Sequence, residues 1–279
     1  MAVKSAERGM AVVRNRAIVA ASALFVVLVL WALAAFVPAW VNSQPRSAPD
    51  DEFGSVDIYN VDDDGVLHPA ATGLAAEVWD TFVRVTTPEF AGAVVTNYWV
   101  SDSPESDTLA YVQQDFEPEY WTLAANLATS EDRTQLIATL VHEYAHILSL
   151  GSSEITPRVH PCLTLSLTEG CANDNSIIWA FDERFWQGYG EDAPAPDNDD
   201  AGVAWEFYQA HEDDFVSDYA ATNVVEDFAE SFMTWVIEDD AAGDSVAASK
   251  LAFFTEYPDY VEIRDRIRAE FTDELGLAN

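Results

Sequence analysis

The sequence predicts an α+β domain preceded by one transmembrane helix. Three observations lead to this fold class: an uncharged apolar run over residues 17–41, strand-like segments between residues 93 and 127, and mainly helical patterns from residue 131 onward. The chain has 279 residues, of which 49% are hydrophobic and 12% are aromatic. This length suits one large domain or two small ones, with enough apolar residues for a sizeable core.

The charge balance is strongly acidic, with 13 Lys and Arg against 49 Asp and Glu and a formal net charge of −36. Nucleic-acid binding requires clustered Lys and Arg, so nucleic acid is not an expected partner. The negative charge is expected to keep an exported domain soluble and to repel acidic substrates. A calcium turn at Asp62-Asp63-Asp64-Gly65 is a minor alternative for one acidic run, since no EF-hand spacing follows it.

The N-terminal region has the properties of a membrane anchor. Residues 1–16 contain four basic groups and one acid, and residues 17–37 form an uninterrupted apolar core. At about 1.5 Å per residue, a helix of this length spans about 30 Å, the thickness of the hydrocarbon core of a bilayer. The positive-inside rule therefore predicts a cytoplasmic basic tail over residues 1–16, a single transmembrane signal anchor over residues 17–41 and an extracellular remainder.

Two alternatives to the anchor stay open. A cleaved signal peptide would use small residues such as Ala32-Leu33-Ala34 as its cleavage site, and the mature protein would then be secreted. A buried core helix is the other alternative, although the apolar run is as long as a membrane span. Both export interpretations leave the same mature part: a polar, proline-containing linker over residues 42–55 and a folded domain over residues 56–279.

The two cysteines agree with export. Cys162 and Cys171 are nine positions apart, and two cysteines in an exported domain usually pair. We therefore expect a disulfide that closes a small loop. The alternative is a pair of buried thiols.

A helix and a small sheet are expected at the start of the folded domain. Leu74, Val78 and Phe82 follow one another at a spacing of four and predict a helix over residues 70–85. β-Branched and aromatic residues predict a strand over residues 93–100. Weaker strand patterns follow over residues 108–114 and 120–127.

Residues 131–150 form the clearest predicted helix. Ser130 is expected to cap its N-terminus, and Gly151 is expected to end it. Apolar side chains cover most of its circumference, so the helix is expected to be buried, with the small sheet packed on it. Two histidines and a glutamate inside such a helix require an explanation.

The second half of the domain is expected to be mainly helical. Predicted helices cover residues 176–186, 223–238, 245–255 and 260–275, and predicted loops cover residues 152–170 and 191–202.

The chemical motif lies in the buried helix and is His142-Glu143-Tyr144-Ala145-His146, an H-E-x-x-H pattern. Residues four apart share one face of a helix, so both imidazoles can bind one metal ion while Glu143 lies beside them. In this arrangement zinc lowers the pKa of water and the glutamate accepts its proton. The alternative is two core histidines whose hydrogen bonds are satisfied.

A catalytic zinc requires a third protein ligand. Ser149 and Ser152 occupy the positions at which a metzincin has Gly and His, which excludes that class. Glu226 and Glu230 are four apart on a predicted helix, so one can bind zinc while the other holds a ligand histidine through its second ring nitrogen. His211 stays open as another third ligand, and an ordinary solvated acidic face is the alternative for the two glutamates.

The combination of motifs resembles one class of zinc protease. HEYAH is followed some eighty residues later by Y-x6-E-x3-E, formed here by Tyr219, Glu226 and Glu230 within YAATNVVEDFAESF. This combination is similar to the zinc proteases related to the catalytic domain of anthrax lethal factor, and to exported bacterial zinc metallopeptidases. The likeness covers about forty residues and, more loosely, a C-terminal helix.

The resemblance implies a zincin-like fold and a role for each matching residue. It assigns His142, His146 and Glu226 as the ligands of one Zn²⁺, Glu143 as the general base, Tyr219 as the group that supports the transition state, and Glu230 as the partner of a ligand histidine.

The function that these expectations support is an exported zinc endopeptidase that hydrolyses peptide bonds with an activated water. Glu143 would accept the proton of that water and pass it to the leaving amine. Protein or peptide is the expected substrate, and the membrane is the expected partner of the N-terminal helix. Two alternatives are a non-catalytic exported binding or sensor domain and a zinc amidase that acts on cell-envelope peptides.

Overall fold

The computed structural model describes residues 44–238 and 243–277. Residues from Arg46 onward form one compact unit, which is described here by itself. The expected basic tail over residues 1–16 and the expected anchor over residues 17–41 lie outside the described residues. Among the residues that are described, no helix combines the length and the apolar character needed to cross a bilayer.

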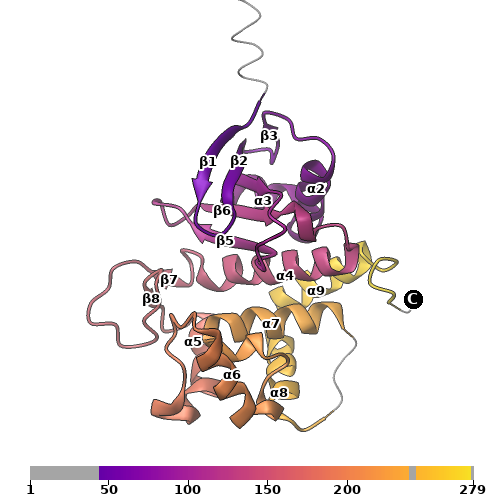
Figure 1. Cartoon of the computed structure of the whole chain (residues 1–279). Coiled ribbons are helices and arrows are strands. Elements are labelled where there is room, and N and C mark those ends of the chain that lie inside the picture. The colour runs from indigo at the N-terminus through magenta and orange to yellow at the C-terminus, as the bar shows by residue number, and fades with distance from the viewer. Residues whose placement is uncertain (1–43, 239–242, 278–279) are drawn as a thin grey trace, which may run out of the picture. The chain divides into compact units, whose positions relative to one another are not determined.

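The N-terminal half of the unit is built on a six-stranded sheet with the order β1-β2-β4-β6-β5, with β3 paired to β2 (Figure 1). Strands β4 and β6 are parallel and the other pairs are antiparallel, which leaves β5 at one edge. The strands are β1 (Arg46–Asp50), β2 (Gly54–Val61), β3 (Leu67–His68), β4 (Val95–Ser101), β5 (Ala110–Gln114) and β6 (Trp121–Asn126). The three predicted strands are thus confirmed as β4, β5 and β6.

The predicted linker over residues 42–55 is wrong from Arg46 onward, because β1 and the start of β2 occupy this segment. None of the five residues of β1 is buried, so the strand needs no alternation of apolar and polar residues. Without that alternation, its sequence gives no signal of a strand. Its strand conformation comes from pairing with β2 and from a small second core on this side of the sheet. That core comprises Phe53, Val56, Ile58 and Ala124, with Ala48, Trp99 and Tyr111 packed against it.

Three helices accompany the sheet: α2 (Leu74–Thr86), α3 (Pro88–Val94) and α4 (Arg133–Leu150). Helix α3 was not expected, although Thr87 accepts a hydrogen bond from the Phe90 backbone N–H and Pro88 occupies the first turn, as is common at a helix start.

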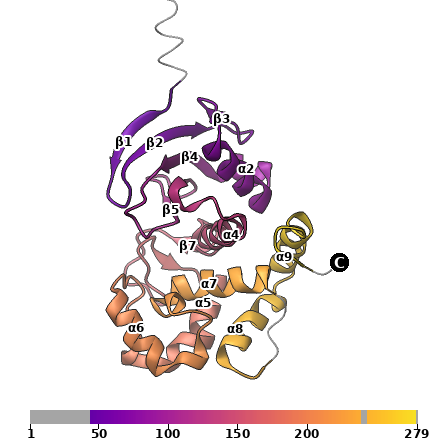
Figure 2. The same ribbon diagram turned by 45° about the vertical axis from the view of Figure 1, so that its right-hand side comes forward.

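Helix α4 confirms the clearest predicted helix, with a different residue as its N-cap. Asp132 accepts the hydrogen bonds of the first turn, whereas the Ser130 hydroxyl donates to the Asn126 carbonyl oxygen. The predicted stop at Gly151 is confirmed, because the helix ends at Leu150 and Gly151 follows it in an extended conformation with φ of −62°. Helix α4 is buried between the sheet and α7 (Figure 2).

The C-terminal half is helical, as expected, and comprises α5 (Ile177–Phe181), α6 (Ala201–Ala210), α7 (Val224–Ile237), α8 (Val246–Phe253) and α9 (Pro258–Glu270). Helix α6 is the unexpected element. It begins where a loop was predicted, because the Asp200 side chain accepts hydrogen bonds from the backbone N–H groups of Gly202 and Val203. Helix α7 lies along α4, so two segments that are far apart in the sequence form one interface (Figure 1).

The segment between α4 and α5 holds the cysteine pair. Strand β7 (Ile155–Thr156) pairs with β8 (Cys171–Ala172). The segment predicted as a loop over residues 152–170 therefore contains a short strand, β7. The Sγ atoms of Cys162 and Cys171 are 2.02 Å apart, which confirms the expected pairing. The described part of the chain is therefore a mixed α/β structure with a small sheet and one disulfide-closed loop.

Candidate metal centre

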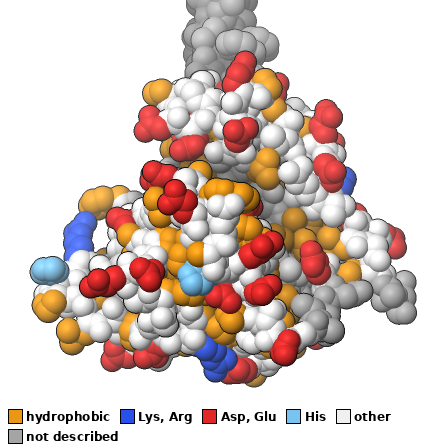
Figure 3. Space-filling model, turned by 60° about the horizontal axis from the view of Figure 1, so that its bottom comes forward, with side chains coloured by type: hydrophobic (Ala, Val, Ile, Leu, Met, Phe, Trp, Pro, Cys, Tyr) orange, Lys and Arg blue, Asp and Glu red, His pale blue; other side chains and the backbone are white. Residues whose placement is uncertain are grey.

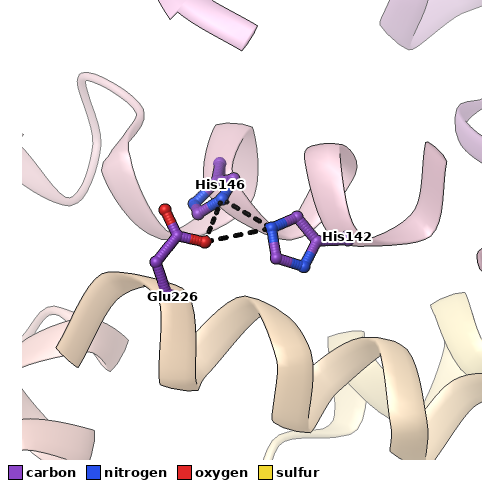
Figure 4. A group of neighbouring side chains, drawn as sticks. All are labelled: His142, His146 and Glu226. Carbon is purple, nitrogen blue, oxygen red and sulfur yellow. Dashed lines mark hydrogen bonds and ion pairs between the residues drawn. The ribbon is translucent and has the colours of Figure 1, made fainter. Parts of the chain in front are cut away.

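Helix α4 brings the two histidines and the glutamate of the HEYAH segment to one buried position. His142, Glu143 and His146 are only 7%, 5% and 8% exposed. Their spacing on the helix places both imidazoles on the face that meets α7 (Figure 4). Polar groups at this depth require partners, and most of their partners come from α7 and from the turn that precedes it.

Helix α7 supplies the third side chain. The Asn223 side chain accepts hydrogen bonds from the backbone N–H groups of Val225 and Glu226, which starts the helix and places Glu226 in its first turn. The Oε2 atom of Glu226 lies 3.2 Å from Nε2 of His142 and 3.4 Å from Nε2 of His146. The two Nε2 atoms are 3.0 Å apart, so three donor atoms converge on one point (Figure 4).

The donor set fits a zinc ion. Zn–N bonds of about 2.0–2.1 Å in tetrahedral geometry place neighbouring donor atoms about 3.3 Å apart, close to the three distances observed. Glu226 Oε2 is buried and makes no hydrogen bond of acceptable geometry, although it lies at ion-pair distance from both rings. Two histidines and one glutamate are also a ligand set of catalytic zinc. A cation at the point of convergence would satisfy all three atoms.

The electrostatics of the site favour a positive charge there. Burial works against protonation of His142, but the nearby carboxylates of Glu226 and Glu230 outweigh it and raise the pKa of His142 well above its usual value. Burial would likewise raise the pKa of Glu226, but the two neighbouring imidazoles outweigh it, so the pKa of Glu226 is lowered. Glu226 therefore stays ionised, as a metal ligand must.

Glu230 lies one helical turn beyond Glu226 and holds His142 from the other side of the ring. Its Oε1 atom is 2.9 Å from Nδ1 of His142, so the opposite nitrogen, Nε2, is left to face the point of convergence. The structure thus places Glu230 where the sequence predicts it. The second oxygen of Glu230 accepts a hydrogen bond from the Ser217 hydroxyl, a contact that no sequence pattern indicated.

Glu143 directly follows His142 in α4 and contacts the edge strand β5 of the sheet. Its carboxylate accepts a hydrogen bond from the backbone of Val112 in β5. Burial is the main reason that the pKa of Glu143 is raised, and the negative charge of Glu226 adds to the effect. A carboxylate with a raised pKa beside a metal centre is a suitable proton acceptor.

Tyr219 reaches the same centre from the 3-10 turn Tyr219–Ala221, which directly precedes α7. Its ring centroid is 5.9 Å from that of His142, and its hydroxyl is within hydrogen-bonding reach of Glu226. Burial and the nearby carboxylates of Glu226 and Glu143 raise the pKa of Tyr219, so the hydroxyl keeps its proton and acts as a donor. The residue as a whole is 52% exposed, so part of the side chain is accessible to a ligand while its hydroxyl lies beside the carboxylates.

Two cavities meet at this centre, with volumes of about 580 Å³ and about 560 Å³, and His142, Glu143 and Tyr219 line both. The first cavity continues along Ala138 and Met233, and the second continues along β5 and several acidic residues. Asp and Glu side chains are scattered over the face shown in Figure 3, where Lys and Arg are few. The centre is thus open to a ligand long enough to extend in two directions.

The other histidine and acidic positions considered above lie elsewhere. His211, the alternative third ligand, lies 3.6 Å from Asp214 and packs against Tyr189 and Phe207. Within residues 44–238 and 243–277, the one group of three metal-ligating side chains with converging donor atoms is His142, His146 and Glu226.

The turn at residues 62–65, which the sequence offered as a minor calcium-binding alternative, is closed by its own contacts. Asp62 Oδ1 accepts hydrogen bonds from the backbone N–H groups of Asp64 and Val66, and Oδ2 pairs with His68 at 2.6 Å. The turn therefore has a structural role that needs no ion.

The comparisons with known proteins identify no family for this chain. A scan against protein-family models found no match, and searches of curated proteins and of solved structures found no significant match.

Proposed function

We propose that this chain is a zinc-dependent endopeptidase of the zincin type, exported and held in the cell membrane by residues 17–41. The observation that carries the proposal is the convergence of His142 Nε2, His146 Nε2 and Glu226 Oε2 at tetrahedral spacing, with Glu143 beside them. The comparisons offer no relative, so the support comes from this geometry and from the HEYAH and E-x3-E motifs.

Glu143, Tyr219 and Glu230 each have a separate role in the proposed hydrolysis. Zinc, when bound, lowers the pKa of water and polarises a carbonyl group. Glu143 accepts the proton of the attacking water and delivers it to the leaving amine. The Tyr219 hydroxyl donates a hydrogen bond to the oxygen that becomes negative in the transition state, and Glu230 holds His142 in place.

The free edge of β5 supports a peptide as the substrate. Ala110 and Val112 of this edge strand line the 560 Å³ cavity together with Glu143. An extended peptide can pair its backbone with such an edge, which would carry a scissile bond across the metal centre. The two cavities on either side of the centre leave room for residues before and after that bond.

The first test is the zinc content of the full chain, purified in detergent with zinc present, for the wild type, His146→Ala, Glu226→Ala and the control His211→Ala. We expect about one zinc per chain in the wild type and in the control, and much less in the other two variants. An absence of zinc from the wild type would contradict the proposal and favour the non-catalytic binding domain.

The second test is hydrolysis, with casein and a cell-wall peptide digest as parallel substrates. Chelation should abolish cleavage, and added zinc should restore it. Cleavage confined to the cell-wall digest would favour the amidase alternative over an endopeptidase.

A further inference from the structure

One carboxylate, that of Glu230, holds two parts of the candidate site at once. Its Oε1 atom pairs with Nδ1 of His142 at 2.9 Å, and its Oε2 atom accepts a hydrogen bond of 2.5 Å from the Ser217 hydroxyl. The Glu230 side chain is only 13% exposed, so water contributes little to fixing its orientation. The two hydrogen bonds therefore determine which way the carboxylate faces.

Ser217 also controls the turn that carries Tyr219. Its Oγ atom accepts a hydrogen bond from the Ala220 backbone N–H at 3.0 Å, so the hydroxyl oxygen lies at the start of the turn. The segment is anchored two residues earlier by Phe215, whose ring packs against Trp186 and lies 3.8 Å below Lys250 Nζ. Phe215 and Ser217 thus both tie this segment to neighbouring parts of the fold.

We propose that Ser217 is a positioning residue that orients both His142 and the Tyr219 turn through Glu230. This inference rests on the proposed metal centre and deepens it. When Ser217 donates to Oε2, Oε1 stays aligned with Nδ1 of His142, which therefore carries the ring hydrogen and leaves the Nε2 lone pair for the metal. The same hydroxyl ties the tyrosine-bearing turn to α7.

The chain offers a matched control at Ser245. This residue accepts the Ala248 backbone N–H at 3.0 Å, with the same spacing of three residues as Ser217 and Ala220, and caps α8. No carboxylate contact is observed for its hydroxyl within the described residues. The variant Ser245→Ala therefore removes a serine cap of the same kind but no contact with a carboxylate. Its effect on zinc affinity shows how much a lost cap alone contributes.

The experiment measures zinc affinity of the metal-free full chain by competition with a chelator. We expect Ser217→Ala to weaken zinc binding about tenfold, as is typical when the partner of a metal-ligating histidine is disturbed. Ser245→Ala should change the affinity less than twofold, and Ser217→Thr should restore most of it. Because Ser217 acts through Glu230, the double variant Ser217→Ala/Glu230→Gln should bind zinc no more weakly than Glu230→Gln alone.

Wild-type affinity in Ser217→Ala would overturn the inference, and so would additive losses in the double variant. If Ser217→Ala does not fold, as judged by circular dichroism, Ser217→Cys gives the same comparison, because a thiol is a much weaker donor.

Peptide hydrolysis, measured alongside, separates this inference from the proposed function. Zinc binding that depends on Ser217 in a chain without hydrolytic activity would support the positioning role and contradict the endopeptidase. Unchanged hydrolysis and zinc affinity in Ser217→Ala would support the endopeptidase and contradict the positioning role.

Discussion

His142 Nε2 and Glu226 Oε2 lie 3.2 Å apart across the interface between α4 and α7. Two unprotonated acceptors at this distance repel each other, so the contact requires a proton or a cation between them. His146 Nε2, at 3.4 Å from the same oxygen, makes a single proton insufficient for all three atoms. This relationship underlies the predictions on metal binding and catalysis that follow.

Glu143→Gln should keep zinc and lose activity. The side chain is not among the three converging atoms, but it is a buried carboxylate next to His142 in the helix, and burial raises its pKa. Loss of the general base should lower kcat about a hundredfold or more. Zinc content and peptide hydrolysis, measured on the same preparation, test this expectation, and turnover that persists in the variant would refute the assigned role.

Tyr219→Phe should lower kcat while KM changes little, because its hydroxyl is assigned to the transition state and not to the bound substrate. Loss of one such donor typically lowers kcat about a hundredfold. Tyr189→Phe is a suitable control, since its hydroxyl donates to Asp214 away from the metal centre. A rise in KM without a change in kcat would show that Tyr219 serves binding instead.

Zinc affinity of the metal-free chain should rise with pH. Glu226 and Glu230 outweigh the effect of burial and raise the pKa of His142, so this ring keeps its proton to a higher pH than an ordinary histidine does. Zinc binds only the neutral imidazole, so binding must release this proton. Calorimetry in two buffers with different ionisation enthalpies measures the release, and a pH-independent affinity would contradict the prediction.

Lys250→Met should be strongly destabilising, because it leaves a buried charge without its partner. Lys250 Nζ lies 2.7 Å from Asp227 Oδ2, and both side chains are fully buried behind the face of α7 that carries Glu226. Breaking such a pair typically costs about 3–5 kcal/mol, whereas replacing both members with apolar residues costs much less. Denaturant unfolding should therefore show Lys250→Met/Asp227→Leu to be more stable than Lys250→Met.

The control for this pair is the exposed contact of Arg184 with Glu256, whose closest distance is 2.6 Å. Arg184→Ala should lower the free energy of unfolding by about 1 kcal/mol or less, because solvent screens exposed ion pairs. Equal losses at the exposed and buried pairs would contradict the assignment of a structural role to Lys250.

The disulfide should be closed in the purified chain and should stabilise it. Alkylation without reductant should leave the mass unchanged, and two alkylated thiols would exclude the bridge. For the short loop between Cys162 and Cys171, the chain-entropy estimate is about 2.5–3 kcal/mol. Cys162→Ser/Cys171→Ser should lower the free energy of unfolding by about that amount.

Elements whose pattern is local could be predicted from the sequence. The HEYAH helix, the E-x3-E helix and three strands of the sheet could be predicted, because side chains three or four apart share a helix face and alternate residues share a strand face. The same argument identified His142, Glu143 and His146 as a group, since their relative positions follow from the helix alone. The cysteine pairing followed from having only two cysteines, close together, in a chain predicted to be exported.

The side chains that meet those of α4 could not be predicted, because they depend on how distant segments pack together. Glu226, Glu230 and His211 were all open as partners, and the packing of α7 on α4 brings the two glutamates to the imidazoles while His211 packs against aromatic rings elsewhere. Strand β1 and the Ser217 contact were missed for the same physical reason. Their conformations depend on pairing and hydrogen bonds with residues distant in the chain, and no local periodicity records such contacts.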